Sequence, residues 1–364
     1  LGVFRTRYPS AARCLKGAMK AEPLSGMRVI DVGTLAAAPL AASLLGDFGA
    51  DIIKVELPGR GDPVRHMGPS YKDVPLWWTV LGRNKRSMTL DLRMSKGQEV
   101  LKRLVSVSDV LIENFMGGTL EEWGLGYEEL RKFNRGLILV RVSGFGQDGP
   151  YKRRPLYDRA AQAMGGLMHV TGYPDKPPLR AGFPVVDDST AVFAALGALM
   201  ALYYRDKRGG EGQVVDCALY ESMLFMSDWD IAAFDKLGLV REREGNVHPS
   251  VAPGDLFRTQ DGHWVLISAV SDDVFRRVAM AIDRAELASD PRFATIPKRV
   301  QCMDMLNGIV EEWVARHALQ DVVDTLTRHQ VVVGPVYTVK DVVEDKHFQQ
   351  RQSILEVDHP TIGI

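Results

Sequence analysis

The sequence has few cysteines, and their spacing argues against a metal site. Cys14, Cys217 and Cys302 stand far apart, with no Cys-x-x-Cys pair and no Cys/His ligand spacing. Isolated cysteines in an odd number indicate free thiols in a reducing compartment. We therefore expect a cytoplasmic protein that holds no metal.

An excess of charge of one sign and a long apolar run are also missing. The 45 Lys and Arg residues and the 46 Asp and Glu residues leave a formal net charge of -1. This balance gives no electrostatic reason to expect a nucleic-acid or anionic-membrane partner. No apolar run reaches the roughly 20 residues that span a bilayer. We expect neither nucleic acid nor membrane as a partner.

The start of the chain lacks acidic side chains, since Glu22 is the first acid. The residues before it include five basic ones: Arg5, Arg7, Arg13, Lys16 and Lys20. An Arg-rich, acid-free start is typical of a mitochondrial transit peptide, and a flexible extension is the plainer interpretation. We treat residues 1–22 as an N-terminal extension and keep the mitochondrial matrix as the alternative location.

The motifs of several enzyme classes are absent. Residues 33–39, in the first expected strand–helix turn, read GTLAAAP and lack the GxGxxG fingerprint of dinucleotide-binding proteins. The chain has no Walker A sequence, no GxSxG elbow and no HExxH helix. These absences disfavour NAD-linked dehydrogenation.

Short apolar runs alternate with amphipathic stretches through the first part of the chain. We expect strands at 27–32, 51–56, 87–92, 109–113 and 136–143, and helices at 39–48, 95–105 and within 120–133. Unbroken apolar strands between helices are typical of a parallel sheet covered on both faces. The pattern predicts a doubly wound, Rossmann-like α/β domain over residues 23–224.

The pattern changes character near residue 238. Before that point we expect a buried helix at 191–205, a strand at 214–218 and a helix at 219–237. Beyond it we expect a hairpin of 256–259 and 263–269, followed by helices at 273–282 and 303–317. We assign 225–330 to a smaller α+β domain.

Two acidic positions could carry chemistry. Asp158 lies at the start of a predicted helix, one turn before Gln162, and Asp187 opens the run Asp-Asp-Ser-Thr before the helix at 191–205. Helix capping would explain either acid. A carboxylate at a helix N-terminus is also kept ionised by the N–H groups there, as a nucleophile requires. Judged from the residues alone, both roles remain open.

Basic residues form loose clusters at 83–86 and 152–154 and at Arg93. Such clusters are usually solvated faces. Several of them fall at strand ends or loops of the expected α/β domain, where phosphate-bearing ligands dock.

Several stretches match a known family in their order and spacing over residues 24–360. They include GDFGADIIKVE at 46–56, PGRGD at 58–62, NKRS at 84–87, ENF at 113–115, GFGQDGP at 144–150 and YD at 157–158. On these stretches the chain resembles the family III CoA-transferases. The resemblance implies a large CoA-binding domain built from both chain ends, a small domain between them, and two subunits interlocked as a homodimer. Residues 331–364 would return to the large domain, and the family's C-terminal extension beyond them is missing from this sequence.

The resemblance also implies a mechanism with Asp187 as the nucleophile, whereas an acid at Asp188 is not required. The carboxylate would attack an acyl-CoA thioester to give an anhydride and then an aspartyl-CoA thioester, from which an acceptor acid takes the coenzyme A. Coenzyme A enters as a thioester substrate, and no cofactor or metal is implied.

Other site residues carry over from the resemblance position by position. Tyr157, Asp158 and Gln162 would support the nucleophile, and CoA would contact a wider set: Ala37, Leu90, Arg93, Asn114, Phe115, Met116 and Arg154.

Leu57 and Glu122 stand where formyl-CoA transferase has arginines. We expect the lost charge to be replaced by one of three other arginines: Arg60, Arg83 or Arg154.

Two alternatives share the fold. The acyl-CoA racemases place a histidine before the acid that corresponds to Asp158, and this chain has Tyr157 there. Coenzyme A transfer within one diacid would use the same nucleophile as transfer between acids. We hypothesise a succinyl-CoA donor and a small mono- or dicarboxylate acceptor, with Arg180 as the candidate that binds a distal carboxylate.

Overall fold

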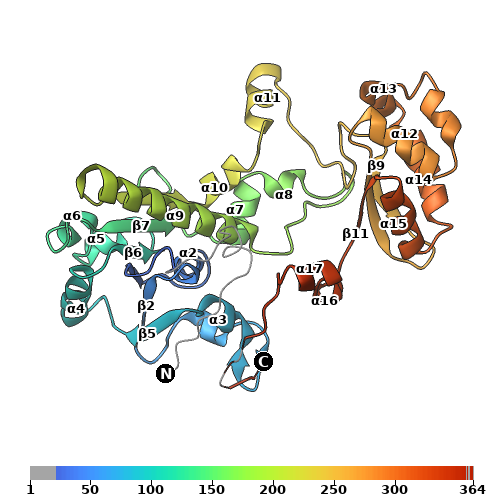
Figure 1. The fold of residues 1–364 in the computed structure, drawn as a ribbon. Coiled ribbons are helices and arrows are strands. Elements are labelled where there is room, and N and C mark those ends of the chain that lie inside the picture. The colour runs from blue at the N-terminus through green and yellow to red at the C-terminus, as the bar shows by residue number, and fades with distance from the viewer. Residues whose placement is uncertain (1–21, 358, 360, 364) are drawn as a thin grey trace. The chain divides into compact units, whose positions relative to one another are not determined.

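The structure is a computed structural model of the chain, and it describes residues 22–357, 359 and 361–363. The expected N-terminal extension, and with it the transit-peptide hypothesis, lies outside the described residues apart from Glu22. The chain forms two compact units (Figure 1). The first comprises the described residues up to Met168 together with Arg180–Val240 and Gln350–Ile364, and the second comprises His169–Leu179 and Arg241–Gln349.

A six-stranded parallel sheet forms the centre of the first unit. Its strand order is β5-β2-β1-β6-β7-β8, so the order reverses direction at β1. The strands are β1 (Arg28–Asp31), β2 (Asp51–Glu56), β5 (Lys85–Thr89), β6 (Val110–Glu113), β7 (Ile138–Ser143) and β8 (Val214–Ala218). The predicted doubly wound α/β domain is thereby confirmed.

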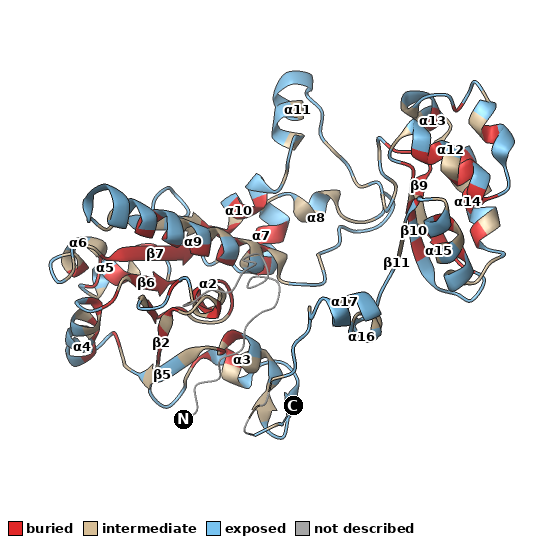
Figure 2. Cartoon of the chain, in the orientation of Figure 1, coloured by how far each residue is buried: buried red, intermediate tan, exposed pale blue. Residues whose placement is uncertain are grey.

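Alternating side chains of the central strands feed two separate cores. In β6, Val110 and Ile112 join the core under α2 (Ala37–Asp47) and α9 (Val185–Tyr204). Leu111 points the other way and joins the core under α4 (Ser95–Val105), α5 (Thr119–Glu122) and α6 (Tyr127–Leu130). Because successive strand residues face opposite sides, an unbroken apolar run is what a sheet covered on both faces requires. The central strands are accordingly buried (Figure 2).

Helix α9 begins six residues earlier than the sequence predicts. It starts at Val185 instead of 191, so Asp187 is its third residue and does not precede it. One helix of the described chain, Val185–Gly209, is long and apolar enough to cross a membrane by length and composition alone. A core helix passes the same test, and α9 packs on α2, β7 and β8.

The other elements of the first unit are short. The expected helix at 219–237 is two helices, because the chain breaks between them at Asp228, which has a φ of 56°. The remaining elements are η1 (Pro63–His66), β3 (Ser70–Tyr71), β4 (Val74–Pro75), α3 (Leu76–Leu81), α7 (Asp158–Met164), α8 (Leu167–Val170), η2 (Arg205–Gly209), α10 (Leu219–Phe225) and α11 (Asp230–Leu237).

The second unit is a three-stranded antiparallel sheet with helices and a core of its own. The sheet order is β11-β10-β9, and the predicted hairpin is its β9–β10 pair. Its elements are β9 (Gly254–Arg258), β10 (Trp264–Ser268), α12 (Asp272–Ala281), η3 (Ala285–Ser289), α13 (Ile296–Gln301), α14 (Met303–Val314), α15 (Leu319–Arg328), β11 (Val332–Pro335), α16 (Val339–Glu344) and α17 (Lys346–Gln350).

The division of the chain differs in detail from the expected boundaries at 225 and 330. The second unit extends to Gln349, because β11 pairs with β10. It also takes in His169–Leu179. That segment is held by hydrogen bonds from Gly245 N to Gly172 O at 2.9 Å and from Arg243 Nη1 to His169 O at 2.8 Å.

Candidate active site

The Asp187 carboxylate lies in the first turn of α9 and is not used to cap that helix. Its side chain is half-buried, and within the described part of the chain no hydrogen bond to its oxygens is found. The hydroxyls of Ser189 and Thr190 bond back to the Val186 carbonyl at 3.1 and 2.7 Å, so they are not caps either. None of residues 187–190 caps α9, so capping does not explain Asp187.

Asp158 caps α9 from another part of the chain. Its Oδ1 accepts hydrogen bonds from Val186 N at 2.9 Å and from Asp187 N at 3.3 Å. A helix leaves its first N–H groups without partners inside the helix, and an acceptor on another segment satisfies them as well as a local cap does. The buried Asp158 therefore fixes the main chain of Asp187 and leaves the Asp187 carboxylate unbonded.

Gln162 braces this arrangement from one turn further along α7. The side chain is fully buried. Its Nε2 donates to Asp158 Oδ2 at 2.7 Å, and its Oε1 accepts from Ala181 N at 2.8 Å. Tyr157, by contrast, is exposed. Of the three predicted supporting residues, the structure brings Asp158 and Gln162 to the start of α9 and leaves Tyr157 at the surface.

Arg180 precedes this braced segment. Its Nη1 donates to the carbonyls of Ala181 and Gly182, at 2.8 and 3.3 Å. The next residue, Ala181, donates its N–H to Gln162. Arg180 therefore lies beside the point at which the segment leading to Asp187 is anchored. The guanidinium is exposed.

The electrostatic environment of Asp187 opposes ionisation. Burial, and then the nearby carboxylates of Asp158 and Asp188, raise the pKa of Asp187 from 3.8 to about 7. Burial and Asp158 also raise the pKa of Asp188, whose side chain is more exposed. The expectation that N–H groups at the helix start keep Asp187 ionised is wrong, because the N–H groups of Val186 and Asp187 donate to Asp158 instead.

A cavity of about 240 Å³ opens at the carboxyl ends of β1, β2, β5 and β6. This edge of an open parallel sheet, near the point where strand order reverses, is where α/β proteins bind ligands. Three of the predicted CoA-binding residues line it: Leu90, Arg93 and Phe115. Arg93 is paired with Asp91, with Nη2 to Oδ2 at 2.6 Å.

The other predicted CoA-binding residues do not line this cavity. Ala37 is the first residue of α2 and is buried, while Met116 is exposed. Asn114 uses its amide on the loop after β1: Oδ1 accepts from Thr34 N at 2.8 Å, and Nδ2 donates to Thr34 O at 2.7 Å. Arg154 stacks over Tyr151, with the guanidinium carbon 3.8 Å from the ring centroid.

Glu122 and the three candidate arginines bear on the phosphate contacts. Glu122 forms an ion pair with Arg153. Arg83 forms a buried ion pair with Asp47, with Nη2 to Oδ2 at 2.7 Å. Arg83 is therefore not available to a phosphate, and the expectation that it replaces a lost arginine is wrong. Arg60 and Arg154 remain exposed.

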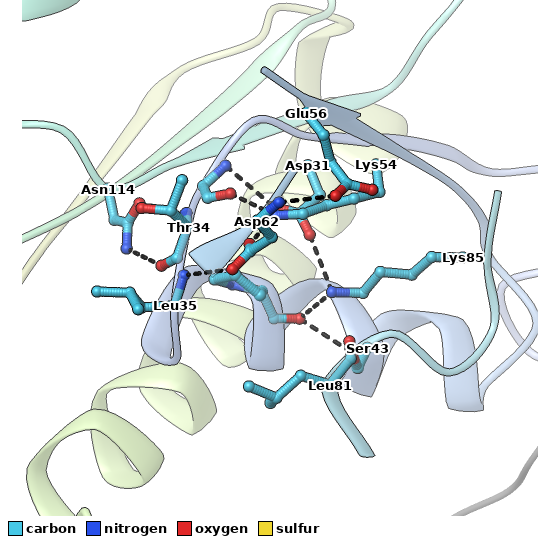
Figure 3. Close-up of polar contacts among 12 residues, drawn as sticks. Asp31, Thr34, Leu35, Ser43, Lys54, Glu56, Asp62, Leu81, Lys85 and Asn114 are labelled. Carbon is cyan, nitrogen blue, oxygen red and sulfur yellow. Dashed lines mark hydrogen bonds and ion pairs between the residues drawn. The ribbon is translucent and has the colours of Figure 1, made fainter. Parts of the chain in front are cut away.

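A buried ionic network lies beside the loop after β1 (Figure 3). Its residues were not predicted from the sequence to belong to the site. Lys54 on β2 approaches Asp62 Oδ2 at 3.0 Å and Asp31 Oδ1 at 3.4 Å, and it donates to the Gly33 carbonyl. Lys85 on β5 donates to Asp31 Oδ2 at 2.9 Å and to Pro39 O at 2.6 Å. The signal in the sequence was a lysine inside the apolar strand at 51–56, which has to find a partner once it is buried.

Known proteins resemble this chain over nearly its whole length. The sequence model of a family described as CoA-transferase family III matches residues 24–364. The chain is 46% identical over 342 residues to succinyl-CoA–D-citramalate CoA-transferase of Chloroflexus aurantiacus, a match covering 94% of this chain and 85% of that protein. It is 34% identical over 344 residues to succinyl-CoA:glutarate CoA-transferase of Mus musculus, covering 94% of this chain and 78% of that protein. A solved CaiB/BaiF family protein from Brucella suis shares 35% identity with a TM-score of 0.81, covering 91% of this chain and 88% of that one.

Proposed function

The chain belongs to CoA-transferase family III and is a CoA-transferase, and from that premise we propose that it moves coenzyme A from succinyl-CoA to a small dicarboxylic acid through intermediates on Asp187. The observation that carries this proposal is the unbonded, half-buried carboxylate in the first turn of α9. Its main chain is fixed by Asp158, so the reacting oxygens are held in place without being consumed by hydrogen bonds.

The proposed reaction proceeds through covalent exchange. The Asp187 carboxylate attacks the thioester carbonyl of the donor, giving a mixed anhydride and CoA thiolate. The thiolate attacks the aspartyl carbonyl, which forms an aspartyl-CoA thioester and releases succinate. The acceptor carboxylate then attacks that thioester, giving a second anhydride, and the thiolate takes the acceptor's acyl group. Each step exchanges one activated acyl bond for another, so the free energy of the thioester is conserved.

We place the coenzyme A part of the donor at the carboxyl edge of the sheet. The cavity there is lined by Leu90, Arg93 and Phe115, together with further apolar residues and three acids: Glu56, Asp62 and Asp91. A cavity lined mainly by apolar residues with a small number of polar and charged groups is the usual form of a small-molecule site. Ala37, Met116 and Arg154 are proposed contacts further along the same ligand, since the loops of Met116 and Arg154 are joined by the Gly117 N to Lys152 O hydrogen bond at 3.1 Å.

The dicarboxylate acceptor is proposed from the relatives and from Arg180. Both relatives named above carry succinyl-CoA and a dicarboxylic acid in their names. One carboxylate of such an acid would attack at Asp187, and the other would be bound by a guanidinium. Arg180 is exposed and is one residue from the Ala181 N–H that Gln162 anchors. A bidentate arginine–carboxylate contact would orient the acid.

We also propose that the chain acts as a homodimer. One face of α9 packs on the sheet, while the opposite face carries exposed apolar side chains at helical spacing: Val192, Leu196, Leu199, Met200 and Tyr203. We call these five residues the outer face of α9, and it is pale blue in Figure 2. A row of exposed apolar residues of this length is typical of an interface, and a second copy of the chain is the proposed partner.

The transfer assay uses purified protein, succinyl-CoA and isotopically labelled free acids, including D-citramalate, glutarate and acetate. We expect labelled acyl-CoA from a dicarboxylate, less from acetate, and none from any acid with Asp187→Ala. Asp188→Ala is the matched control and keeps most of the activity. Intramolecular transfer would be favoured if no labelled free acid becomes a thioester while coenzyme A moves between the two carboxyl groups of one diacid. Full turnover by Asp187→Ala would overturn the proposal.

Arg180 is tested in the same assay. Arg180→Gln should raise KM for the dicarboxylate about 10-fold or more and leave KM for succinyl-CoA unchanged, because a charge-assisted bidentate contact is lost. Arg159→Gln, an exposed arginine on α7, is the control. An unchanged KM for the acceptor in Arg180→Gln would show that the distal carboxylate binds elsewhere.

A further inference from the structure

The loop between β1 and α2, residues 33–36, is held by side chains from four other places in the chain. Its peptide groups bond to Asp31, Lys54, Asn114 and Asp62 (Figure 3). Gly33 N donates to Asp31 at 3.0 Å, and Leu35 N donates to Asp62 at 3.2 Å. A surface turn needs few such bonds, because water satisfies its peptide groups. This loop is clamped at every residue from 33 to 35.

Leu35 shows what the clamp achieves. Its φ is 64°, in the left-handed region that leucine avoids because its Cβ crowds the following carbonyl. No glycine stands at that position to make the conformation easy. Such a residue persists only where its surroundings over-determine it, and such residues gather at functional sites. Here the hydrogen bond from Leu35 N to Asp62 and the two hydrogen bonds between Thr34 and Asn114 hold the strained residue from both sides.

Lys54 joins the separate parts of this clamp. Its ammonium donates to Gly33 O and forms ion pairs with Asp62 and Asp31, and its side chain is 1% exposed. Asp62 in turn accepts from Val64 N at 3.0 Å, which fixes the η1 turn that carries it. The charge of Lys54 thus balances the two carboxylates that hold the ends of the loop. A neutral residue at 54 would leave Gly33 O without its donor and one acid without its counter-ion.

The clamped loop borders the proposed substrate site. Gly33, Thr34 and Asp62 line the cavity at the carboxyl edge of the sheet, and the loop leads directly into Ala37. We propose that Lys54 is a positioning residue for the transfer reaction, which holds the loop after β1 in the strained form that aligns the donor thioester with Asp187. This assignment rests on the proposed function, and it adds a residue that does not itself touch substrate.

The test compares two charge-balanced double variants. Lys54→Met with Asp62→Asn removes one buried ion pair of the clamp and leaves Asp31 paired with Lys85. Arg83→Met with Asp47→Asn removes another buried ion pair, which lies at the opposite end of α2 from the loop. Both variants lose a buried pair of the same domain, and only the first releases the loop. Circular dichroism and thermal unfolding verify that each is folded.

The readout separates binding from alignment. The dissociation constant of free CoA is measured by calorimetry, and the rate of covalent modification by saturating succinyl-CoA is measured by intact mass. We expect Lys54→Met/Asp62→Asn to slow modification by about 10- to 100-fold, because a displacement near 1 Å costs a factor of that size. Its affinity for CoA should change no more than about threefold, and the Arg83/Asp47 variant should keep the wild-type rate within about threefold.

The outcomes that contradict the assignment are distinct. Equal modification rates in the two double variants would overturn it, as would a slow rate explained entirely by weaker CoA binding. If Lys54→Met/Asp62→Asn does not fold, Lys54→Gln alone decides: the shorter, neutral side chain removes the ion pairs with Asp62 and Asp31, and a wild-type rate there overturns the assignment. Absence of modification in the wild type, with CoA bound, would overturn the proposed function and this assignment with it.

Discussion

Asp187, the proposed nucleophile, has to be ionised to attack a thioester, and its surroundings work against ionisation. Burial and the carboxylates of Asp158 and Asp188 raise its pKa to about 7. We therefore predict that the single-turnover rate of enzyme modification rises with pH and levels off above a midpoint near 7. Stopped reactions from pH 5 to 9, analysed by intact mass, give the midpoint. A rate that is flat down to pH 5 would contradict this prediction.

The same pKa shift predicts a stability difference. A carboxyl group with a folded-state pKa near 7 and an unfolded value of 3.8 binds more protons when folded, so stability falls as pH rises between those values. At pH 8 the free energy of unfolding of Asp187→Asn should therefore exceed that of wild type by a value on the order of 2 kcal/mol, after allowance for partial solvent exposure. The variant is the more stable protein at this pH. The difference should vanish below about pH 4. Urea unfolding at the two pH values measures it, and a destabilised variant at pH 8 would contradict it.

The sequence could predict which residues form the site, but it could not predict which groups they bond to. Asp187, Asp158 and Gln162 were all named from sequence, because the resemblance fixes their register. The pKa of Asp187 could not be predicted, since it depends on which carboxylate receives the N–H groups of α9. The roles of Lys54 and Leu35 could not be predicted for the same reason. The buried ammonium of Lys54 and the left-handed backbone of Leu35 are both stabilised by residues distant in sequence.

The start of α9 depends on a cap from another element. Asp158 Oδ1 accepts from Val186 N, 28 residues along the chain. Asp158→Ala should lower the free energy of unfolding by about 2 kcal/mol, because it removes a buried cap and leaves N–H groups unpaired. Chemical denaturation measures the change, and a loss below about 0.5 kcal/mol would show that the helix start is held by other contacts.

Asp158→Asn separates the charge from the cap. The amide oxygen still accepts from the helix, while one of the two carboxylates that raise the Asp187 pKa is gone. The midpoint of the pH–rate profile should move to lower pH in this variant. An unchanged midpoint would assign the raised pKa of Asp187 to burial and Asp188, without a contribution from Asp158.

The elements themselves were largely predictable, apart from their ends. Helix α4 and strands β2 and β8 have the predicted bounds, because polar residues punctuate the apolar runs there. The start of α9 was misplaced because Asp-Asp-Ser-Thr is a typical capping sequence, and the helix continues through it once Asp158 supplies the cap. The break between α10 and α11 follows the left-handed Asp228, which the apolar pattern of 219–237 does not indicate.

In the whole molecule, two cores fill the first unit and a third fills the second. The parallel sheet was predictable from the strand pattern, while the exposed outer face of α9 was not. Pattern analysis placed this helix in the interior because it is apolar on most sides. Only the structure distinguishes the side that packs on the sheet from the side that is left exposed.

The proposed homodimer is tested on that outer face. Leu196→Glu with Met200→Glu places two charges on it and should convert the dimer to monomer in sedimentation velocity, because desolvating unpaired carboxylates opposes association. Val107→Glu, at an exposed apolar residue after α4, is the control and should remain dimeric. A double variant that sediments like wild type would exclude this face as the interface.

The proposed nucleophile is tested most directly by trapping the enzyme-bound thioester. Wild-type protein and the Asp187→Asn and Asp188→Asn variants are incubated with succinyl-CoA, and the thioester is trapped with hydroxylamine and located by peptide mapping. We predict that wild type and Asp188→Asn gain the mass of coenzyme A less one water, with the hydroxamate at Asp187, and that Asp187→Asn gains nothing. A hydroxamate at Asp188, or an adduct that survives in Asp187→Asn, would contradict it.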